Sequence, residues 1–356
     1  MFLKRLSLLN FRNYSSLSLE FDQRPTIFLG NNAVGKSNLL EAIYFLSTTK
    51  SSRAETESEI IKVEEEVTRV QGVIIEKGKG KREKSENILE INLQNNEGQF
   101  RKQVKVNGIP RRTVDFIGTL VAVIFYPADI NMVTGSPSLR RWHLDLSLAQ
   151  VDSHYKKTLT QYEQIVVARN RVLKRIREGE GQGDELIYWN QELVKLGKVI
   201  SDKRNEFFEF VKGLKDPLGN FEFIYKPSNI SGERLDQYSG REIASATTLV
   251  GPHRDDFSVN DKKRNLAHFG SRGEQRLATL AFKLAQLEYM AEVLGERPIL
   301  LLDDVFSELD AKHRGQVIDI VGRQQTILAT VELEHISKKF LNSARILKVE
   351  DGKISE

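Results

Sequence analysis

The sequence predicts an α/β protein of mixed sheets and helices, interrupted by an inserted helical domain. Short apolar runs such as Thr26–Leu29 and Ile299–Leu302 are typical of buried strands, and a glycine-containing loop and an amphipathic segment follow the first run. From Tyr155 to Val211, by contrast, apolar residues recur at the spacing of helices. Because the strand-like pattern stands on both sides of this stretch, we expect one domain to be split by another.

The N-terminal part of the chain is expected to be rich in strands. Phe2–Leu9 alternates between apolar and polar residues, and Asn38–Leu46 is the first segment with an apolar helical face. Between residues 60 and 125 most apolar runs are short and separated by polar turns. This pattern predicts further strands, the last of them at Val121–Phe125.

Two helices are predicted in the inserted stretch. Apolar residues recur at coiled-coil-like spacing over Tyr155–Ile176 and again over Leu186–Val211, and Gly179–Gly183 separates the two segments. We expect an antiparallel helical hairpin in an arm domain of residues 151–244. Residues 1–150 and 245–356 are then the two parts of the head domain. The pattern leaves open whether the hairpin projects from the head or packs on it.

The C-terminal part returns to the globular pattern from Leu249. A long helix is predicted over Leu277–Leu294, a buried strand over Ile327–Ala329 and a small hairpin over Ile346–Ile354. The turn of this hairpin is expected at Asp351-Gly352, a dipeptide that is typical of tight turns.

Composition limits the classes of protein to which the chain can belong. Of its 356 residues 40% are hydrophobic and 29% charged, and no run of about 18 apolar residues occurs, so we expect a soluble protein without a membrane span. The absence of cysteine excludes disulfides, thiol catalysis and thiolate metal sites. Met1–Leu9 does not resemble an export signal, so the expected location is the cytoplasm. A net charge of +4 suits a nucleic-acid partner and an ordinary basic enzyme equally well.

The glycine-containing loop fits the phosphate-binding motif G-x-x-x-x-G-K-[ST] in full. Its residues are Gly30, Asn31, Asn32, Ala33, Val34, Gly35, Lys36 and Ser37. The glycines allow backbone N–H groups to surround an anion, and the positive end of the following helix adds to the field. We expect Lys36 to reach the outer phosphates of ATP and Ser37 to bind Mg²⁺. A chance glycine turn, the alternative, leaves both side chains unexplained.

Two adjacent acids end the apolar strand at Ile299–Leu302. Ligands of open α/β sheets bind at the carboxyl ends of the strands, which is where Asp303 and Asp304 stand. We expect Asp303 to hold Mg²⁺, and Asp304 to act with Lys36 in catalysis by polarising the attacking water. Adjacent side chains point to opposite faces of a strand, which favours different roles. Taken alone, the pair also fits two solvated acids at a turn.

A third segment starts the long C-terminal helix. Its residues are Ser271, Arg272, Gly273 and Glu274. They fit a capping box, and they also fit the signature segment of ABC-type ATPases, whose serine binds the γ-phosphate held by a second subunit. The two interpretations are compatible. The order along the chain, from glycine loop through this segment and the aspartate strand to Ser307 and Asp310 of a D-loop, favours an ABC-type P-loop ATPase head.

Several motifs are similar to those of the RecF family, which is related to the SMC ATPases. The resemblance extends over nearly the whole chain, and its most specific runs are GPHRDD at 251–256 and PILLLDDVFSELD at 298–310. Its other segments are Asn10–Tyr14, Gly30–Ile43 and Gly135–Pro137 with Arg140 and Arg141.

The resemblance implies more than the residue patterns do. It implies an ABC-type head with an inserted arm, a homodimer that forms with ATP, slow Mg²⁺-dependent ATP hydrolysis, and binding to DNA at single-stranded gaps or duplex junctions. It further implies that the protein loads recombinase in recombinational repair, replication and the SOS response, together with RecR and possibly RecO.

Some positions depart from related patterns or leave their role open. Asp304 stands where most ABC ATPases have glutamate, and Glu274 stands where RecF-like chains often have glutamine. Thr330 is a candidate for the place of the usual switch histidine, and Asp129 for that of the Q-loop glutamine. Arg53 matches a basic position of the family, where it either contacts a phosphate or remains a surface arginine.

Two rival functions remain. A transporter ATPase subunit shares these motifs, but the interval from Ser37 to Ser271 is far longer than in such subunits. A nucleotide-regulated scaffold that binds proteins and not DNA is the second alternative. Candidate DNA contacts are Lys77–Lys84, Arg111-Arg112 and Arg140-Arg141. The histidine and acids of 251–256 are expected to form a salt-bridged turn and no catalytic site.

Overall fold

The chain forms two compact units in this structure, a computed structural model that describes residues 1–77, 84–96, 98–215 and 218–356. The first unit comprises Met1–Asp129 and Thr279–Glu356, and the second is Ile130–Ala278. The arm predicted at 151–244 lies within the second unit, which begins earlier and ends later along the chain. Within the described ranges, every helix is too short or too polar to span a lipid bilayer.

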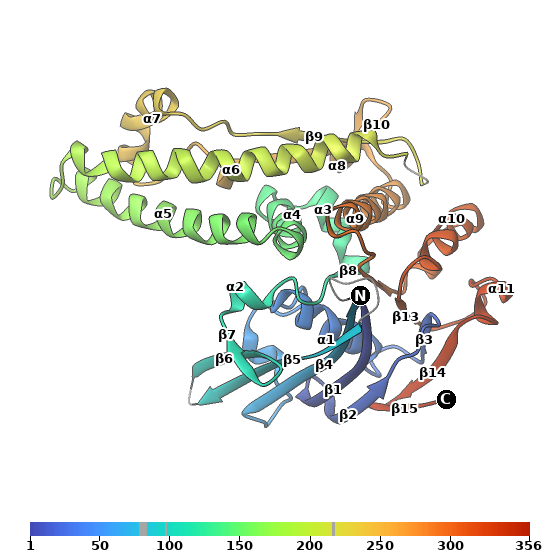
Figure 1. Ribbon diagram of the computed structural model, residues 1–356. Helices are drawn as coiled ribbons and strands as arrows, with labels where there is room; N and C mark the ends of the chain where they lie inside the picture. The colour runs from blue at the N-terminus through green and yellow to red at the C-terminus, as the bar shows by residue number, and fades with distance from the viewer. Residues whose placement is uncertain (78–83, 97, 216–217) are drawn as a thin grey trace. The chain divides into compact units, whose positions relative to one another are not determined.

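Within its described residues, the first unit has two six-stranded sheets (Figure 1). The antiparallel sheet has the order β2-β1-β4-β5-β6-β7 and the mixed sheet the order β15-β14-β3-β13-β12-β8. The antiparallel strands are β1 (Phe2–Phe11), β2 (Tyr14–Glu20), β4 (Val67–Lys77), β5 (Lys84–Asn96), β6 (Gln99–Val106) and β7 (Ile109–Arg111). The strands of the mixed sheet are β3 (Thr26–Leu29), β8 (Ala122–Phe125), β12 (Ile299–Asp303), β13 (Thr326–Thr330), β14 (Arg345–Glu350) and β15 (Lys353–Ser355).

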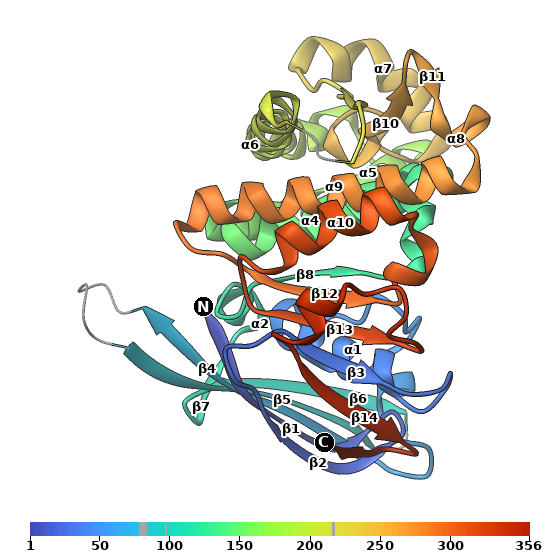
Figure 2. The ribbon, with the colours of Figure 1, turned by 90° about the vertical axis from the view of Figure 1, so that its right-hand side faces the viewer.

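Helix α1 (Lys36–Thr48) packs between these two sheets (Figure 2). The predicted apolar face, with Leu39 and Ile43, is fully buried, and Phe45 on another side of the helix is buried as well. A helix that is buried nearly all round is the centre of a core. The other helices of this unit are η1 (Glu57–Ile60), α2 (Thr113–Phe116), η2 (Pro127–Ile130), η5 (Phe306–Glu308), α10 (Ala311–Val321) and α11 (Lys338–Leu341).

The centre of the mixed sheet is parallel and buried on both faces. Strand β13 pairs with β3 and β12, and β12 pairs with β8, all in the parallel sense. The predicted strands at 26–29, 121–125, 299–302 and 327–329 are therefore confirmed. Because parallel strands end at the same edge, the glycine loop after β3, Asp303 at the end of β12 and Thr330 at the end of β13 meet there.

The second unit is mostly helical and contains a three-stranded antiparallel sheet, β11-β10-β9, within its described residues. Its α-helices are α3 (Asn131–Thr134), α4 (Pro137–Val151), α5 (Ser153–Arg177), α6 (Leu186–Gly213), α7 (Gly232–Ser245) and α8 (Leu266–Phe269), and α9 (Arg272–Leu294) begins in it. Its strands are β9 (Phe221–Lys226), β10 (Asp256–Asp261) and β11 (Arg264–Asn265), and its short turns are η3 (Gly183–Glu185) and η4 (Pro252–Arg254).

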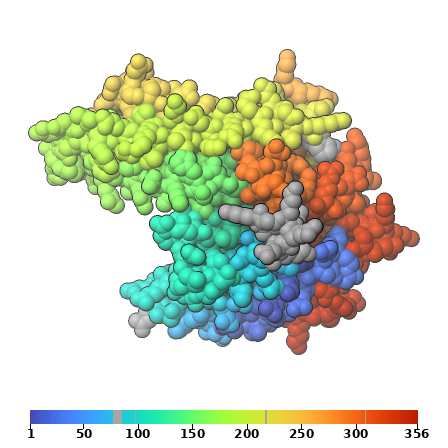
Figure 3. Space-filling view, in the orientation of Figure 1, coloured from blue at the N-terminus to red at the C-terminus, as the bar shows by residue number. Residues whose placement is uncertain are grey.

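Helices α5 and α6 are the predicted antiparallel hairpin, and they form one continuous surface, coloured green to yellow, in Figure 3. Strand β9 lies in the predicted arm domain of residues 151–244, after the two predicted helices, where no strand was predicted. Its partner β10 begins 30 residues after it ends, with Asp256 opposite Lys226. A pairing over that separation has no local signal in the sequence.

The turn at 251–256 is salt-bridged, as predicted. The buried guanidinium of Arg204 on α6 lies 2.8 Å from carboxylate oxygens of both Asp255 and Asp145, and it donates to the carbonyl oxygen of Pro252 at 2.6 Å. His253 is hydrogen-bonded to Tyr162, and burial lowers the pKa of His253 to about 4. At neutral pH this histidine is therefore uncharged and forms part of the packed turn.

Two of the candidate DNA contacts have internal partners instead. Arg140 donates to both carboxylate oxygens of Asp256, at 2.6 and 2.9 Å, and Arg141 donates to the carbonyl oxygen of Asp255 at 2.7 Å. These arginines stabilise the turn in the second unit. Most of the candidate segment Lys77–Lys84, namely residues 78–83, lies outside the described residues.

Candidate nucleotide-binding site

Both motif glycines of the loop are required by its backbone path. A side-chain carbon at Gly30 would lie 2.3 Å from the carbonyl oxygen of Val349, which is closer than any real contact. Gly35 has a φ of +112°, a conformation that other residues rarely adopt, and a side chain there would meet Asn13 at 2.5 Å. The loop can follow this path only with glycine at both positions.

Helix α1 begins without a competing anion. Its N-cap residue, Gly35, supplies no side-chain hydrogen bond, and the first turn contains no acidic residue. Among the residues that the structure describes, no capping side chain therefore competes for the N–H groups of this turn, and the helix dipole adds positive potential at the same end. The neighbouring loop residues Asn31, Asn32 and Ala33 are exposed. This arrangement suits a phosphate group.

Lys36 lies against the carbonyl groups of the loop. Its ammonium group donates to the carbonyl oxygens of Gly30 and Asn31, each at 2.7 Å. Burial lowers the pKa of Lys36, and the nearby carboxylates of Asp303 and Asp304 act in the opposite direction. The ammonium group of Lys36 thus lies near both the glycine loop and the carboxylates at the end of β12.

Asp303 and Ser37, the two predicted Mg²⁺ ligands, come together although 266 positions separate them in the sequence. Asp303 is 8% exposed. Burial raises its pKa, whereas hydrogen bonding by the Ser37 hydroxyl and the charges of Arg53 and Lys36 lower it. A carboxylate and a hydroxyl oxygen are hard ligands, and Mg²⁺ commonly takes one or two such protein groups and completes its shell with water and phosphate oxygens. The donor set therefore fits Mg²⁺.

Asp304 combines a strained backbone with an unpaired oxygen. Its φ of +48° is in the left-handed region, and its N–H donates to the carbonyl oxygen of Ala329 at 2.9 Å. Its Oδ1 atom is buried and has no hydrogen-bond partner in the described part of the chain. Because buried polar atoms are nearly always paired, this oxygen is suited to accept a hydrogen bond from a water or a ligand. Such strain is also concentrated at functional sites.

Arg53 is tied to helix α1. It donates to Oδ1 of Asn38 at 2.9 Å, and its Nη1 lies 3.5 Å from Oε2 of the buried Glu41. Glu41 also accepts two hydrogen bonds from Arg12, at 2.6 and 3.0 Å. The charge of Arg53 lowers the pKa of Asp303, so the guanidinium group of Arg53 acts on the same site as Asp303. Contact with a phosphate remains a prediction.

Asn13 and Tyr14 support the loop from the hairpin between β1 and β2, and our sequence analysis gave them no role. Asn13 donates to the carbonyl oxygen of Val34 at 3.1 Å and accepts a hydrogen bond from Asn38 at 2.9 Å. The hydroxyl of Tyr14 donates to the carbonyl oxygen of Gly35 at 3.1 Å. These contacts hold the left-handed Gly35 in place. In the sequence, the available sign of this role was a polar residue, Asn13, between Arg12 and the aromatic Tyr14. That sign does not reveal which part of the chain Asn13 contacts.

The Ser271 segment forms the predicted capping box. The N–H of Ser271 donates to Oε2 of Glu274 at 2.7 Å, and the N–H of Glu274 donates to the Ser271 hydroxyl at 3.3 Å. Arg264 donates to the other carboxylate oxygen of Glu274 at 3.0 Å. The hydrogen bonds from Ser271 and Arg264 lower the pKa of Glu274, which is therefore ionised. Ser271, Arg272 and Gly273 are exposed at this helix end.

The remaining predicted positions have clear local roles. Asp310 caps α10 by accepting from the N–H of His313 at 2.9 Å, and Ser307 donates to the carbonyl oxygen of Asp304 at 2.8 Å. Asp129 accepts from the N–H of Tyr126 and lies 3.3 Å from the ammonium group of Lys283, so its carboxylate has partners within the first unit. Thr330 is buried at the end of β13, and the carbonyl oxygen of this residue accepts from Gly30.

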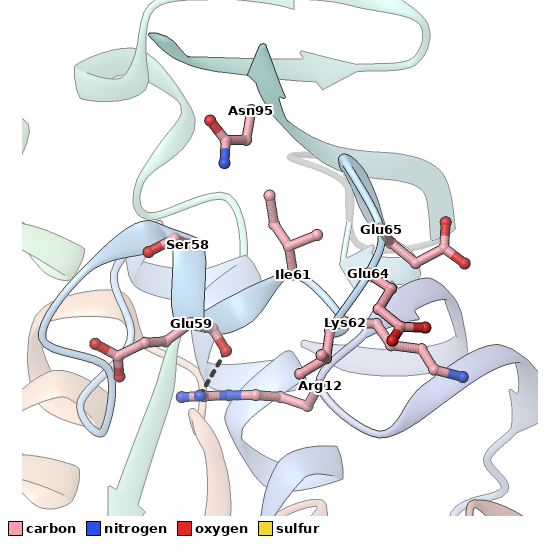
Figure 4. A pocket seen from close by; sticks show the side chains of 9 residues that line it. Arg12, Ser58, Glu59, Ile61, Lys62, Glu64, Glu65 and Asn95 are labelled. Atoms are coloured by element: carbon pink, nitrogen blue, oxygen red, sulfur yellow. Dashed lines mark hydrogen bonds between the residues drawn. The ribbon is translucent and has the colours of Figure 1, made fainter. Parts of the chain in front are cut away.

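An open cavity of about 490 Å³ lies between Arg12 and the segment of residues 58–65 (Figure 4). Arg12, which lines it, donates to the carbonyl oxygen of Glu59 at 2.6 Å, and the next residue, Asn13, contacts the loop. The cavity is lined by Arg12, Ser58, Glu59, Ile61, Lys62, Val63, Glu64, Glu65 and Asn95. No motif in the sequence indicated this cavity, because its walls come from three separate segments.

Comparison with known proteins identifies the family. The family model described as RecF/RecN/SMC N terminal domain matches residues 2–355. The chain is 35% identical over 368 residues to the DNA replication and repair protein RecF of Lachnoclostridium phytofermentans, with both chains covered in full.

Solved structures agree with this match. The recombination mediator protein RecF, solved as RecF-ATP in the RecFOR pathway, has a TM-score of 0.86 and 30% identity, with 99% of this chain and 98% of that chain covered. The Smc head domain of Pyrococcus furiosus has a TM-score of 0.54 at 17% identity over 99% and 95% of the two chains, which shows the fold alone. The predicted ABC-type ATPase fold is confirmed, and the chain belongs to the RecF family of DNA replication and repair proteins.

Proposed function

We propose that this chain binds ATP with Mg²⁺ at the glycine loop and hydrolyses it slowly. The observation that carries the proposal is the group of side chains at the carboxyl edge of the central strands. There the uncapped start of α1 and Lys36 meet the pair of Ser37 and Asp303 and the unpaired oxygen of Asp304. The solved relative named RecF-ATP supports ATP as the nucleotide.

Each group has a distinct task in this proposal. Lys36 and the N–H groups of α1 bind phosphate oxygens, and Ser37 and Asp303 hold Mg²⁺, which neutralises charge on those oxygens. Asp304 orients and polarises the attacking water through its unpaired Oδ1. Because an aspartate is one methylene shorter than the usual glutamate, it reaches the water less well, and we expect weak ATPase activity.

We propose the Arg12 cavity as the site of the nucleoside. Three glutamates, Glu59, Glu64 and Glu65, line it together with the cations Arg12 and Lys62, so the cavity carries acceptor groups without the excess of positive charge that favours phosphate. Carboxylate oxygens accept hydrogen bonds from the amino group and hydroxyl groups of adenosine. The phosphates would then occupy the adjoining loop, which carries the positive potential.

The proposal extends to two copies of the chain. A γ-phosphate bound at one loop offers negative charge to a second copy, and the exposed Ser271 end of α9 offers a helix N-terminus and a hydroxyl. Because the Ser271 oxygen accepts from the N–H of Glu274, its proton remains available to donate to a phosphate oxygen. ATP then favours the dimer, because its γ-phosphate contacts Ser271 of the second copy only in the dimer. ADP has no γ-phosphate and therefore does not favour the dimer over the monomer.

A substitution at Ser271 separates binding from dimerisation. Ser271→Arg is expected to bind ATP with unchanged affinity and to remain monomeric, because the larger side chain fills the space of the γ-phosphate. Ser245→Arg, at an exposed serine on α7, is the control and should dimerise like the wild type. Nucleotide titration and analytical ultracentrifugation measure the two properties. Dimerisation of Ser271→Arg with ATP would rule out this contact.

We further propose that the dimer binds DNA at single-stranded gaps or junctions and acts with RecR, and possibly RecO, to load recombinase. The relatives named for DNA replication and repair and for the RecFOR pathway support this. Contacts to phosphates make such binding fall steeply with salt. Gel shifts with gapped, duplex and single-stranded DNA test it. No shift in any nucleotide state would favour a protein scaffold instead.

A further inference from the structure

Phe269 is an aromatic side chain that the protein exposes to solvent. It is 70% exposed, the highest value for an aromatic residue within the described ranges. It is the last residue of α8 and stands two positions before Ser271. Arg272, on the other side of Ser271, is exposed as well. Aromatic residues and arginines are the residue types most enriched in the energetic centres of protein interfaces.

The outward position of Phe269 is fixed by packing. Leu266 is fully buried and anchors α8 in the second unit. The side chain of Asn265 caps the helix by accepting a hydrogen bond from the N–H of Ala267 at 2.9 Å. The buried Gln275 donates to the carbonyl oxygen of Leu266 at 2.8 Å, which ties α8 to the start of α9. A side chain at Gly270 would lie 2.7 Å from that same carbonyl oxygen, so the turn after Phe269 follows this path only with glycine at position 270.

We infer that Phe269 is the apolar contact by which a second copy of this chain is held when ATP is bound. The inference rests on the proposed role of Ser271. A phosphate oxygen that accepts from the Ser271 hydroxyl lies within about 3 Å of it, which brings the loop of the second copy over the adjoining surface. Phe269 is exposed only two positions from Ser271 in the chain, so a partner that offers its γ-phosphate to Ser271 approaches the part of the surface where the ring can be buried.

The ring and the serine contribute in different ways. Hydrogen bonds to phosphate fix the position of the second copy and depend on the nucleotide, whereas burial of a phenyl ring supplies non-directional affinity that is independent of charge. Phe269 thus adds affinity to the dimer that does not depend on hydrogen bonds to phosphate.

The absence of cysteine allows a direct test of burial. Phe269→Cys introduces a single thiol, and so does the control Ile187→Cys on α6, at a side chain that is 58% exposed. We expect a non-hydrolysable ATP analogue to slow maleimide labelling at position 269 by about tenfold or more relative to ADP. Labelling at position 187 should be the same in both nucleotides.

A second pair of variants measures the contribution to affinity. Phe269→Ser is expected to raise the Kd of the ATP-dependent dimer by about tenfold or more, with ATP affinity unchanged, whereas Ile187→Ser leaves both at wild-type values. If Phe269→Cys dimerises with ATP but its thiol stays equally reactive, or Phe269→Ser dimerises as tightly as the wild type, this inference is wrong and the proposed function stands. If the wild type does not dimerise, the proposed function fails and the inference fails with it.

Discussion

Replacing Asp304 with asparagine is expected to slow ATP hydrolysis by roughly 100-fold or more, the usual contribution of a positioned base. The carboxylate that polarises water is lost, whereas the Ser37–Asp303 pair and Lys36 remain. Asparagine tolerates the left-handed backbone at this position, where Asp304 has a φ of +48°, so the end of β12 should keep its structure. ATP affinity is expected to stay within about threefold of wild type, and the ATP-bound dimer should last longer.

Single-turnover phosphate release and equilibrium binding of ATP measure these two effects. Asp319→Asn, at an exposed acid on α10, is the control and should hydrolyse ATP at the wild-type rate. A wild-type rate for Asp304→Asn would show that the unpaired oxygen has no part in hydrolysis. Loss of ATP binding would instead assign Asp304 a structural role.

Replacing Arg204 with methionine is expected to lower the free energy of unfolding of the second unit by about 3–5 kcal/mol, because it leaves the buried carboxylate of Asp255 and the partly buried carboxylate of Asp145 without their cation. Asp255 is nearly inaccessible, and Asp145 accepts from Arg204 through both of its oxygens. Asp255 retains a hydrogen bond from the N–H of Ser228 at 2.6 Å, so we expect the lower half of the range.

Intrinsic fluorescence isolates this effect. The chain has two tryptophans, and both Trp142 and Trp189 lie in the second unit, so denaturant unfolding followed by tryptophan emission reports that unit alone. Lys203→Met is the matched control, because its partners Asp152 and Glu206 are solvent-accessible. We expect a cost below about 1 kcal/mol for it. Equal destabilisation by both variants would contradict a special role for the buried Arg204 cluster.

The sequence predicted those features whose partners are close in the chain or whose pattern is regular. The capping box of Ser271 and Glu274 spans one helical turn, and the glycine loop and the strand before Asp303 follow from residue type and apolar runs. The capping box and the glycine loop are determined by residues close together in the chain. The salt-bridged turn at 251–256 was likewise predicted from its composition, but its partner Arg204 lies on α6 and the sequence did not indicate it.

Features that depend on strand register or distant packing could not be predicted. Asn13 supports Gly35 only because the hairpin of β1 and β2 lies against the loop, and β9 pairs with a strand that begins 30 residues later. Arg140 resembled a surface cation in sequence, yet it is buried against Asp256. Exposure of an arginine depends on the fold around it and not on its neighbours in the chain.

In the proposed function, the triphosphate of ATP brings two copies of the chain together. Sedimentation equilibrium of the wild type, with Mg²⁺ and either a non-hydrolysable ATP analogue or ADP, tests this most directly. We expect the molar mass to double with the ATP analogue and to remain that of a monomer with ADP. The same mass in both nucleotides, at protein concentrations up to tens of micromolar, would contradict it.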